Sequence, residues 1–175
     1  MTDPRKHDKS HPPGRRDQGG LTHLADDGSA AMVDVTSKAR TSRKAVAHGF
    51  LRCSRRAFRL LVDGGNPKGD VQQVARVAGI MGGKRAGELI PLCHLLPAAS
   101  VRVDVEPDAS IPGLRVIATA TITERTGVEM EALTAVSVAL LTAYDMLKAV
   151  DRGMTIESVR LEEKSGGRSG SWRRE

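Results

Sequence analysis

Hydrophobic and polar residues alternate along two stretches that a turn separates. VRVDVE (101–106) and LRVIATATIT (114–123) carry an apolar side chain at nearly every second position, and PDASIPG lies between them. Because successive side chains of a strand point to opposite faces of a sheet, these stretches predict an antiparallel hairpin with one buried face. Further strands are predicted by shorter stretches at 32–35, 46–53 and 154–162.

Three other segments show helical signals instead. Ser54 followed by RRAFRLLVDGG predicts a short helix that begins at the serine cap and ends at the glycines. After the turn NPKGD, Asp70 can cap a second helix, and a third helix of more than five turns begins near Thr126. The apolar face predicted for the second helix consists of Val71, Val74, Ala75 and Ala78. Strands grouped around these helices predict an α+β fold, with an antiparallel sheet and helices packed on one face.

The longest helix begins with two glutamates. Thr126 and Glu129 have the spacing of a capping box, in which each side chain satisfies a free backbone N–H group, and a ligand-binding role for Glu129 is the equal alternative. Glu131 lies beyond the box, so capping does not explain it. The predicted apolar stripe of this helix is Leu133, Val136, Leu140, Tyr144 and Leu147, and the opposite side carries Met130, Glu131, Thr134, Val138, Thr142, Asp145 and Lys148. That mixture predicts a second packing surface around a polar site.

Glu131 and Asp145 lie far apart on this helix. Their separation in sequence corresponds to about 21 Å at the helical rise of 1.5 Å per residue. A small ligand can hardly contact both residues of one chain, so either the ligand is long or the two ends of the helix serve different copies of a site shared between subunits. We expect the shared site, because a helix that is apolar nearly all round needs cover on both sides.

Two lysines are candidate partners of Asp145. Lys148 stands three residues beyond it, at the spacing of a simple surface ion pair. Lys68 stands just ahead of the helix that Asp70 caps, where it could be a solvated turn residue, a base, or a donor to phosphate oxygens.

IPLCHLLP (90–97) holds the only adjacent cysteine and histidine, Cys93 and His94. Neighbouring residues are poorly placed to bind one metal ion, and no second pair stands at zinc spacing, so we expect no metal site. A structural His94 in a turn is the alternative to a functional one. EKSGGRSG (163–170) combines Lys164 and Arg168 with three glycines, which could wrap phosphates or form a loose end.

The net charge of +6 lies mostly at the two ends of the chain. Residues 1–20 are polar and rich in Pro, Gly and charge, so we expect a disordered tail followed by one domain, 21–163, and a basic glycine-rich segment, 164–175. One Trp, one Tyr and two Phe give no aromatic platform for stacking bases, so we expect no nucleic-acid partner.

No apolar core follows the basic start of the chain, so we expect no secretory signal. The longest apolar run, 132–144, is too short to cross a bilayer, so we expect no membrane span. Two unpaired cysteines fit a cytoplasmic protein.

Five segments together resemble the cyclic pyranopterin monophosphate synthase family of molybdenum cofactor biosynthesis. They are LTHLADDGSAAMVDV, KGDVQQVARVAGIM, KRAGELIPLCHLLP, TGVEMEALTAVSVALLTAYDMLKAVDRGM and EKSGG. The resemblance runs from about Leu21 to Trp172. Leu95 departs from it where the family usually has proline, and Arg168 stands where lysine is frequent.

The resemblance implies a fold, an assembly and a reaction. The subunit would be ferredoxin-like, in a hexamer built as a trimer of dimers with the active site at a dimer interface. A 3′,8-cyclised 7,8-dihydroguanosine triphosphate would rearrange to cyclic pyranopterin monophosphate and release diphosphate, with no cofactor beyond a possible Mg²⁺ on the triphosphate.

The resemblance also assigns site residues. Asp145, Lys68 and Lys148 match catalytic positions; Leu92, Cys93, His94, Met130 and Glu131 match substrate-binding positions; and Arg43 and Lys164 match positions that would meet the triphosphate. Glu131, together with Glu129, would accept hydrogen bonds from the guanine-derived N–H groups.

Two rival functions belong to other classes. The basic ends suggest a non-catalytic nucleotide- or RNA-binding module, whose affinity should fall steeply with salt. A hydrolase of ordinary GTP would need a phosphate-binding glycine loop followed by Lys and Ser or Thr, which the sequence lacks.

Overall fold

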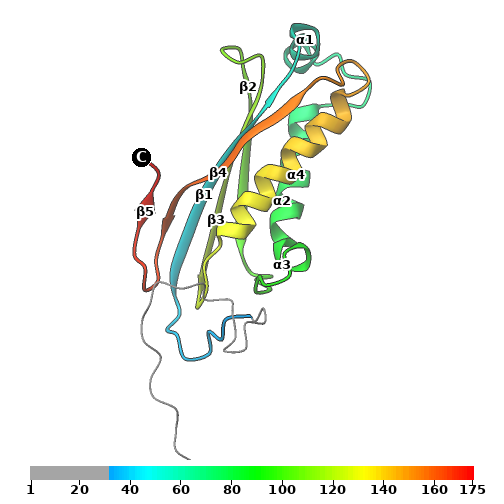
Figure 1. Cartoon of the computed structure of the whole chain (residues 1–175). Coiled ribbons are helices and arrows are strands. Elements are labelled where there is room, and N and C mark those ends of the chain that lie inside the picture. Colours follow the sequence, from blue (N-terminus) through cyan, green and yellow to red (C-terminus); the bar gives the residue numbers. More distant parts are fainter. Residues whose placement is uncertain (1–31) are drawn as a thin grey trace, which may run out of the picture. The chain divides into compact units, whose positions relative to one another are not determined.

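A five-stranded antiparallel sheet organises the computed structural model, which describes residues 32–175 (Figure 1). The elements are β1 (Thr41–Arg52), α1 (Arg55–Asp63), α2 (Val71–Lys84), α3 (Ala86–Leu89), β2 (Ser100–Asp108), β3 (Gly113–Glu124), α4 (Glu129–Leu147), β4 (Thr155–Ser165) and β5 (Trp172–Arg173). The strand order is β2-β3-β1-β4-β5, and every neighbouring pair is antiparallel. Without α1, α3 and β5 this is the βαββαβ arrangement of ferredoxin-like folds, which confirms the predicted α+β class.

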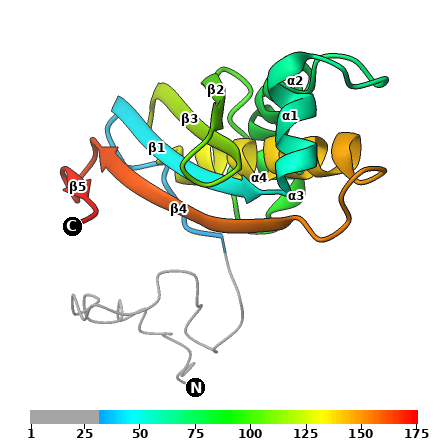
Figure 2. The ribbon, with the colours of Figure 1, turned by 90° about the horizontal axis from the view of Figure 1, so that it is seen from above.

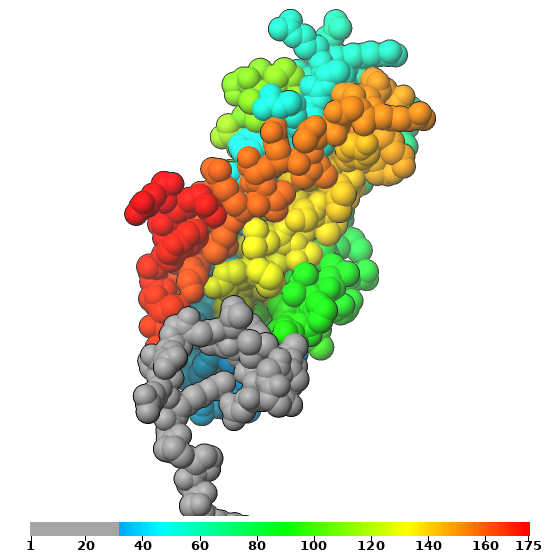
Figure 3. Space-filling model, viewed as in Figure 1, coloured from blue at the N-terminus to red at the C-terminus, as the bar shows by residue number. Residues whose placement is uncertain are grey.

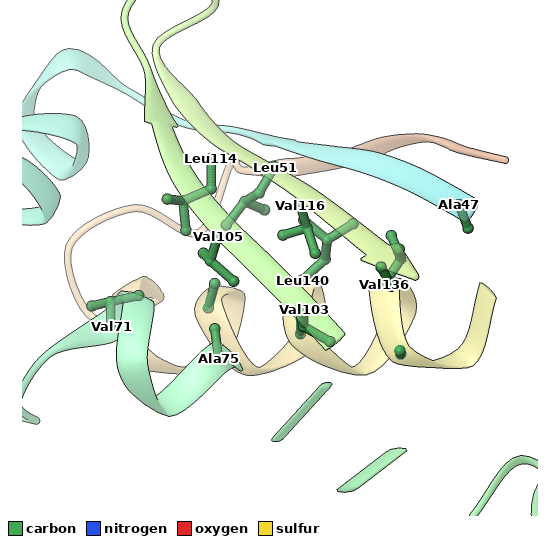
Figure 4. Close-up of a cluster of buried hydrophobic side chains, with 14 of the residues drawn as sticks. Ala47, Leu51, Val71, Ala75, Val103, Val105, Leu114, Val116, Val136 and Leu140 are labelled. Atoms are coloured by element: carbon green, nitrogen blue, oxygen red, sulfur yellow. The ribbon is translucent and has the colours of Figure 1, made fainter. Parts of the chain in front are cut away.

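Helices α2 and α4 lie against the same face of the sheet (Figure 2). That face is built from alternate, mostly small residues of β1 and β3, such as Ala45 opposite Ala120 and Ala47 opposite Ala118. At Gly49 a Cβ atom would lie only 2.9 Å from Leu140 of α4, so the absence of a side chain lets the helix approach the sheet. Figure 4 shows the apolar side chains of both layers meeting in the core.

The contact between α2 and α4 depends on glycines. A Cβ atom at Gly79 would lie 2.9 Å from the Ala135 carbonyl oxygen, and one at Gly82 would lie 2.6 Å from the Val138 side chain. The predicted apolar face of α2 was therefore wrong in one respect: Val74 is 43% exposed, and the buried stripe turns from Val71 toward the glycines. Close backbone approach, and not side-chain volume, decides which face of α2 is covered.

Both predicted helix starts before α4 are confirmed. The Ser54 hydroxyl accepts a hydrogen bond from the Ala57 N–H, and the Asp70 carboxylate accepts from the N–H groups of Gln72 and Gln73. The hairpin is also confirmed, with Val103 opposite Ala118.

The capping box predicted for α4 is wrong. The N-cap is Val128, which makes no side-chain capping bond, and Glu129 is already the first helical residue. The Glu129 carboxylate folds back over Gly127, where a Cβ atom would clash with it, and approaches Lys164 across the strand end. An ion pair with a distant residue thus replaces the local bond to Thr126.

The strand predicted at 32–35 is also wrong. This segment has no strand geometry, because the Asp34 carboxylate accepts the Thr36 N–H at 2.8 Å and Lys38 N–H donates to the Val35 carbonyl, which makes a turn. The strand predicted at 46–53 exists but begins earlier, at Thr41. The disordered tail predicted for residues 1–20 lies outside the described residues, as does the start of the domain predicted at 21–163.

The C-terminal segment folds back along the sheet. Lys164 and Ser165 end β4, and Trp172 pairs with Lys164 in the antiparallel register of β5. The space-filling view shows this return strand, in red, packed along β4, in orange (Figure 3).

α4 is the one helix among residues 32–175 that is long and apolar enough to pass a length and composition test for a membrane span. Nine of its residues are buried between the sheet and α2, which is the environment of a core helix.

Candidate active site

Asp145 lies near the C-terminal end of α4 between two lysines. The Lys148 Nζ is 2.6 Å from Asp145 Oδ1, and the Lys68 Nζ is 3.3 Å from Oδ2. Lys68 also donates a hydrogen bond to the backbone carbonyl of Asp145 at 2.9 Å. All three predicted catalytic residues therefore meet within one chain, although Lys68 precedes Asp145 by 77 positions.

A turn ahead of α2 places Lys68. The Asn66 side-chain oxygen accepts the Lys68 N–H at 2.9 Å, while its amide group donates to the Met146 carbonyl at 3.2 Å. Gly69 follows with a φ of 96°, a value that favours glycine. Sequence reasoning recognised this turn but missed Asn66, whose amide joins it to the end of α4.

The two lysines determine the charge state of the aspartate. Hydrogen bonds from Lys148 and then from Lys68 lower the pKa of the Asp145 carboxyl below its ordinary value. Its side chain is 58% exposed, so solvent reaches the cluster and screens the attraction. The cluster offers an anionic carboxylate flanked by two proton donors at the surface.

Glu131 lies in a different environment, at the N-terminal end of α4. It is only 2% exposed, and its Oε2 has no hydrogen-bond partner among residues 32–175. Burial raises the pKa of the Glu131 carboxyl; a hydrogen bond from its own backbone N–H opposes this shift, and the negative charge of Glu129 adds to it. The Cys93 thiol lies near these two glutamates. Burial raises the pKa of the thiol, and the negative charges of Glu131 and Glu129 raise it further.

Two basic residues adjoin this end of α4. The Lys164 Nζ lies 3.5 Å from the Glu129 carboxylate and donates to the Ser169 hydroxyl at 2.8 Å. Arg43 on β1 donates from Nε and Nη2 to the carbonyls of Glu124 and Arg125, both at 3.2 Å. These bonds hold Arg43 beside the segment that leads into α4.

A cavity of about 330 Å³ opens beside the segment that follows α3. His94 and Leu95 line it together with Glu124, Arg125 and Thr126. Leu92 and Cys93, which precede His94, are half-buried, as is Met130 on α4. Most of the predicted substrate-binding residues thus gather around the start of α4.

The predicted site residues form two separate clusters. The Lys68–Asp145–Lys148 cluster and the region of Glu131 lie at opposite ends of α4, about 21 Å apart along the helix. We expected a neighbouring subunit to cover a second side of α4, besides the side that packs on the sheet. Helix α2 of the same chain covers this second side instead. The two clusters of one chain are still too far apart for one small ligand to contact both.

Within the described part of the chain, no group of three or more His, Cys, Asp or Glu side chains is arranged to hold a metal ion. The prediction concerning Mg²⁺ refers to the triphosphate, so it stays a prediction.

Comparisons with known proteins agree on one family. The model of the MoaC family matches residues 32–167. A cyclic pyranopterin monophosphate synthase of Brucella ovis is 56% identical over 154 residues, which covers 88% of this chain and 93% of that protein. Proteins of the same name from Methylobacterium sp. (strain 4-46) and Methylobacterium nodulans are 58% and 57% identical, and the matches cover 87% and 89% of this chain and 95% and 97% of theirs.

Proposed function

The chain belongs to the MoaC family, and from this premise we propose that it converts (8S)-3′,8-cyclo-7,8-dihydroguanosine 5′-triphosphate to cyclic pyranopterin monophosphate with release of diphosphate. It acts as a lyase in molybdenum cofactor biosynthesis, in the cytoplasm. The observation that carries the proposal is the meeting of Lys68, Asp145 and Lys148 in one cluster.

This cluster suits the proton transfers of the reaction. Rings of the substrate must open and re-form, which requires protons to leave and return at several atoms. Asp145 is held in its anionic form and can accept a proton, while the neighbouring ammonium groups can donate one. An anion generated in the substrate is stabilised by the same two positive charges.

The other end of α4 suits binding of the base and the phosphates. Glu131 and Glu129 accept hydrogen bonds from the guanine-derived N–H groups, and Leu92, Cys93, His94 and Met130 contact the ring system. Arg43 and Lys164 meet the triphosphate, and a Mg²⁺ ion bound to the triphosphate would neutralise part of its negative charge. Negative charge grows on the diphosphate as it leaves, and the positive side chains of Arg43 and Lys164 stabilise that charge.

The active site is shared between subunits in this proposal. Since one helix separates the two clusters by about 21 Å, each cluster pairs with the complementary cluster of another chain. The assembly is a homohexamer formed as a trimer of dimers, with each site at a dimer interface. Glu131 is 2% exposed in the single chain, and its Oε2, which has no partner among residues 32–175, is the acceptor that the substrate would satisfy.

Product formation tests the reaction. The purified protein is incubated with the cyclised guanosine triphosphate, and the product is oxidised and detected by pterin fluorescence. We expect fluorescence with the wild-type chain. A folded protein that yields none would overturn the proposed function.

Complementation between variants tests the shared site. Glu131→Ala and Asp145→Asn chains, each inactive alone, are mixed after dissociation and reassembly of the oligomer. If different chains supply the two residues, some interfaces carry an intact site and partial activity returns. Activity that stays at background, with subunit exchange confirmed by mass, would show that each site draws both residues from one chain.

A further inference from the structure

The loop between β4 and β5, residues 166–171, closes tightly over two basic side chains. Gly166 and Gly167 have φ values of 95° and 76°, in the left-handed region. A Cβ atom at Gly166 would clash with the Ser42 carbonyl, and one at Gly167 would clash with the Arg43 guanidinium. The loop therefore follows the surface of β1 so closely that both positions need glycine.

The same loop brings a hydroxyl group to Lys164. The Ser169 hydroxyl accepts a hydrogen bond from the Lys164 Nζ at 2.8 Å, and the Glu129 carboxylate lies 3.5 Å from the same nitrogen. The backbone of Lys164 is fixed by its pairing with Trp172 in β5. Backbone and side chain of the lysine are thus both held by the C-terminal segment.

From this arrangement we infer that Ser169 is a positioning residue that orients the Lys164 ammonium group toward the phosphates of the substrate. An ammonium group has three N–H donors. Ser169 engages one and Glu129 attracts a second, which leaves one donor for a phosphate oxygen. Without the hydroxyl, the long lysine side chain regains rotamer freedom that must be lost again when the substrate binds.

Ser169 acts through Lys164 and not through stability. It lies exposed in a turn, so its side chain contributes little to the core. This inference rests on the proposed function, because the phosphates belong to the proposed substrate. Its tests therefore include a measurement that needs no turnover.

Steady-state kinetics test the role of the hydroxyl. We expect Ser169→Ala to raise KM about three- to tenfold, the range of one lost hydrogen bond, with kcat changed less than about twofold. Ser169→Thr keeps a hydroxyl and should restore a KM near that of the wild type. Ser171→Ala, an exposed serine of the same loop, is the matched control and should leave KM unchanged. Equal effects of the alanine and threonine variants, or of Ser169→Ala and Ser171→Ala, would overturn the inference.

Binding of inorganic diphosphate, measured by calorimetry, separates this inference from the proposed function. Ser169→Ala should weaken binding about three- to tenfold in the wild-type chain but not in a Lys164→Ala chain, because the two residues act as one unit. The same loss in both backgrounds, or no loss in the wild-type chain, would refute the role through Lys164. A wild type that binds diphosphate in this pattern but forms no pterin would contradict the proposed function alone.

Discussion

Glu131→Gln should make the protein more stable while it weakens the enzyme. The wild-type carboxylate is 2% exposed and one of its oxygens has no partner among residues 32–175, and burying this charged form costs about 1–3 kcal/mol more than burying the neutral amide. The helix dipole stabilises the negative charge of Glu131 in the first turn of α4 by about 0.3–1 kcal/mol, which offsets part of this cost. We therefore expect the neutral amide to raise the free energy of unfolding by about 1 kcal/mol at pH 8.

This gain should depend on pH in a defined direction. Because burial raises the pKa of the Glu131 carboxyl in the folded state, the wild type loses stability as pH rises from the ordinary glutamate pKa through the raised value. The glutamine variant has no such loss, so its advantage is largest at pH 8 and smallest at pH 5. For a chain of this size the gain corresponds to a melting temperature about 2–4 °C higher.

Thermal unfolding at pH 5 and pH 8, at one protein concentration, measures the effect. Glu129→Gln is the matched control, since this neighbouring carboxylate is partly exposed and paired with Lys164, and its substitution should change stability by less than about 1 kcal/mol. Turnover of Glu131→Gln should fall about 10–100-fold, because an amide N–H group would face a substrate donor. A variant less stable than wild type at pH 8, or a gain of equal size at both pH values, would refute the reasoning.

Three further predictions concern the other cluster and the core. Asp145→Asn should abolish turnover with an unchanged circular dichroism spectrum, and near-normal product formation would rule out a catalytic Asp145. Lys68→Ala and Lys148→Ala should each lower kcat about 10²–10⁴-fold, whereas a loss of only a few-fold in both would reduce them to surface charges. Gly79→Val should lower the free energy of unfolding by about 2 kcal/mol or more in denaturant titration, because its Cβ would lie 2.9 Å from the Ala135 carbonyl; an unchanged midpoint would show that α2 can shift freely.

Local signals in the sequence predicted the elements well. The alternation in 101–106 and 114–123 predicted the hairpin, since a strand with one buried face imposes its period on the residues themselves. Ser54 and Asp70 were recognised as caps because each bonds to backbone within three residues of itself. The family was recognisable because matching segments follow in order over most of the chain.

Two predictions failed where a distant residue competes with a local rule. Thr126 has the spacing of a cap, but Glu129 is drawn to Lys164 on β4. Val74 has the spacing of a core residue, but the glycines of α2 turn another side of the helix toward α4. Periodicity describes one element, whereas the partner that covers it comes from elsewhere in the chain.

The sequence by itself determined the central hairpin, the caps at Ser54 and Asp70, the family and the residue types of the candidate site, because these depend on local periodicity and on ordered motifs. Only the tertiary structure decided that Lys68 reaches Asp145 of its own chain, that Glu131 is buried, and that Ser169 holds Lys164. Each of these facts depends on segments that pack together without being neighbours in sequence, and the free energy of that packing is a property of the whole fold.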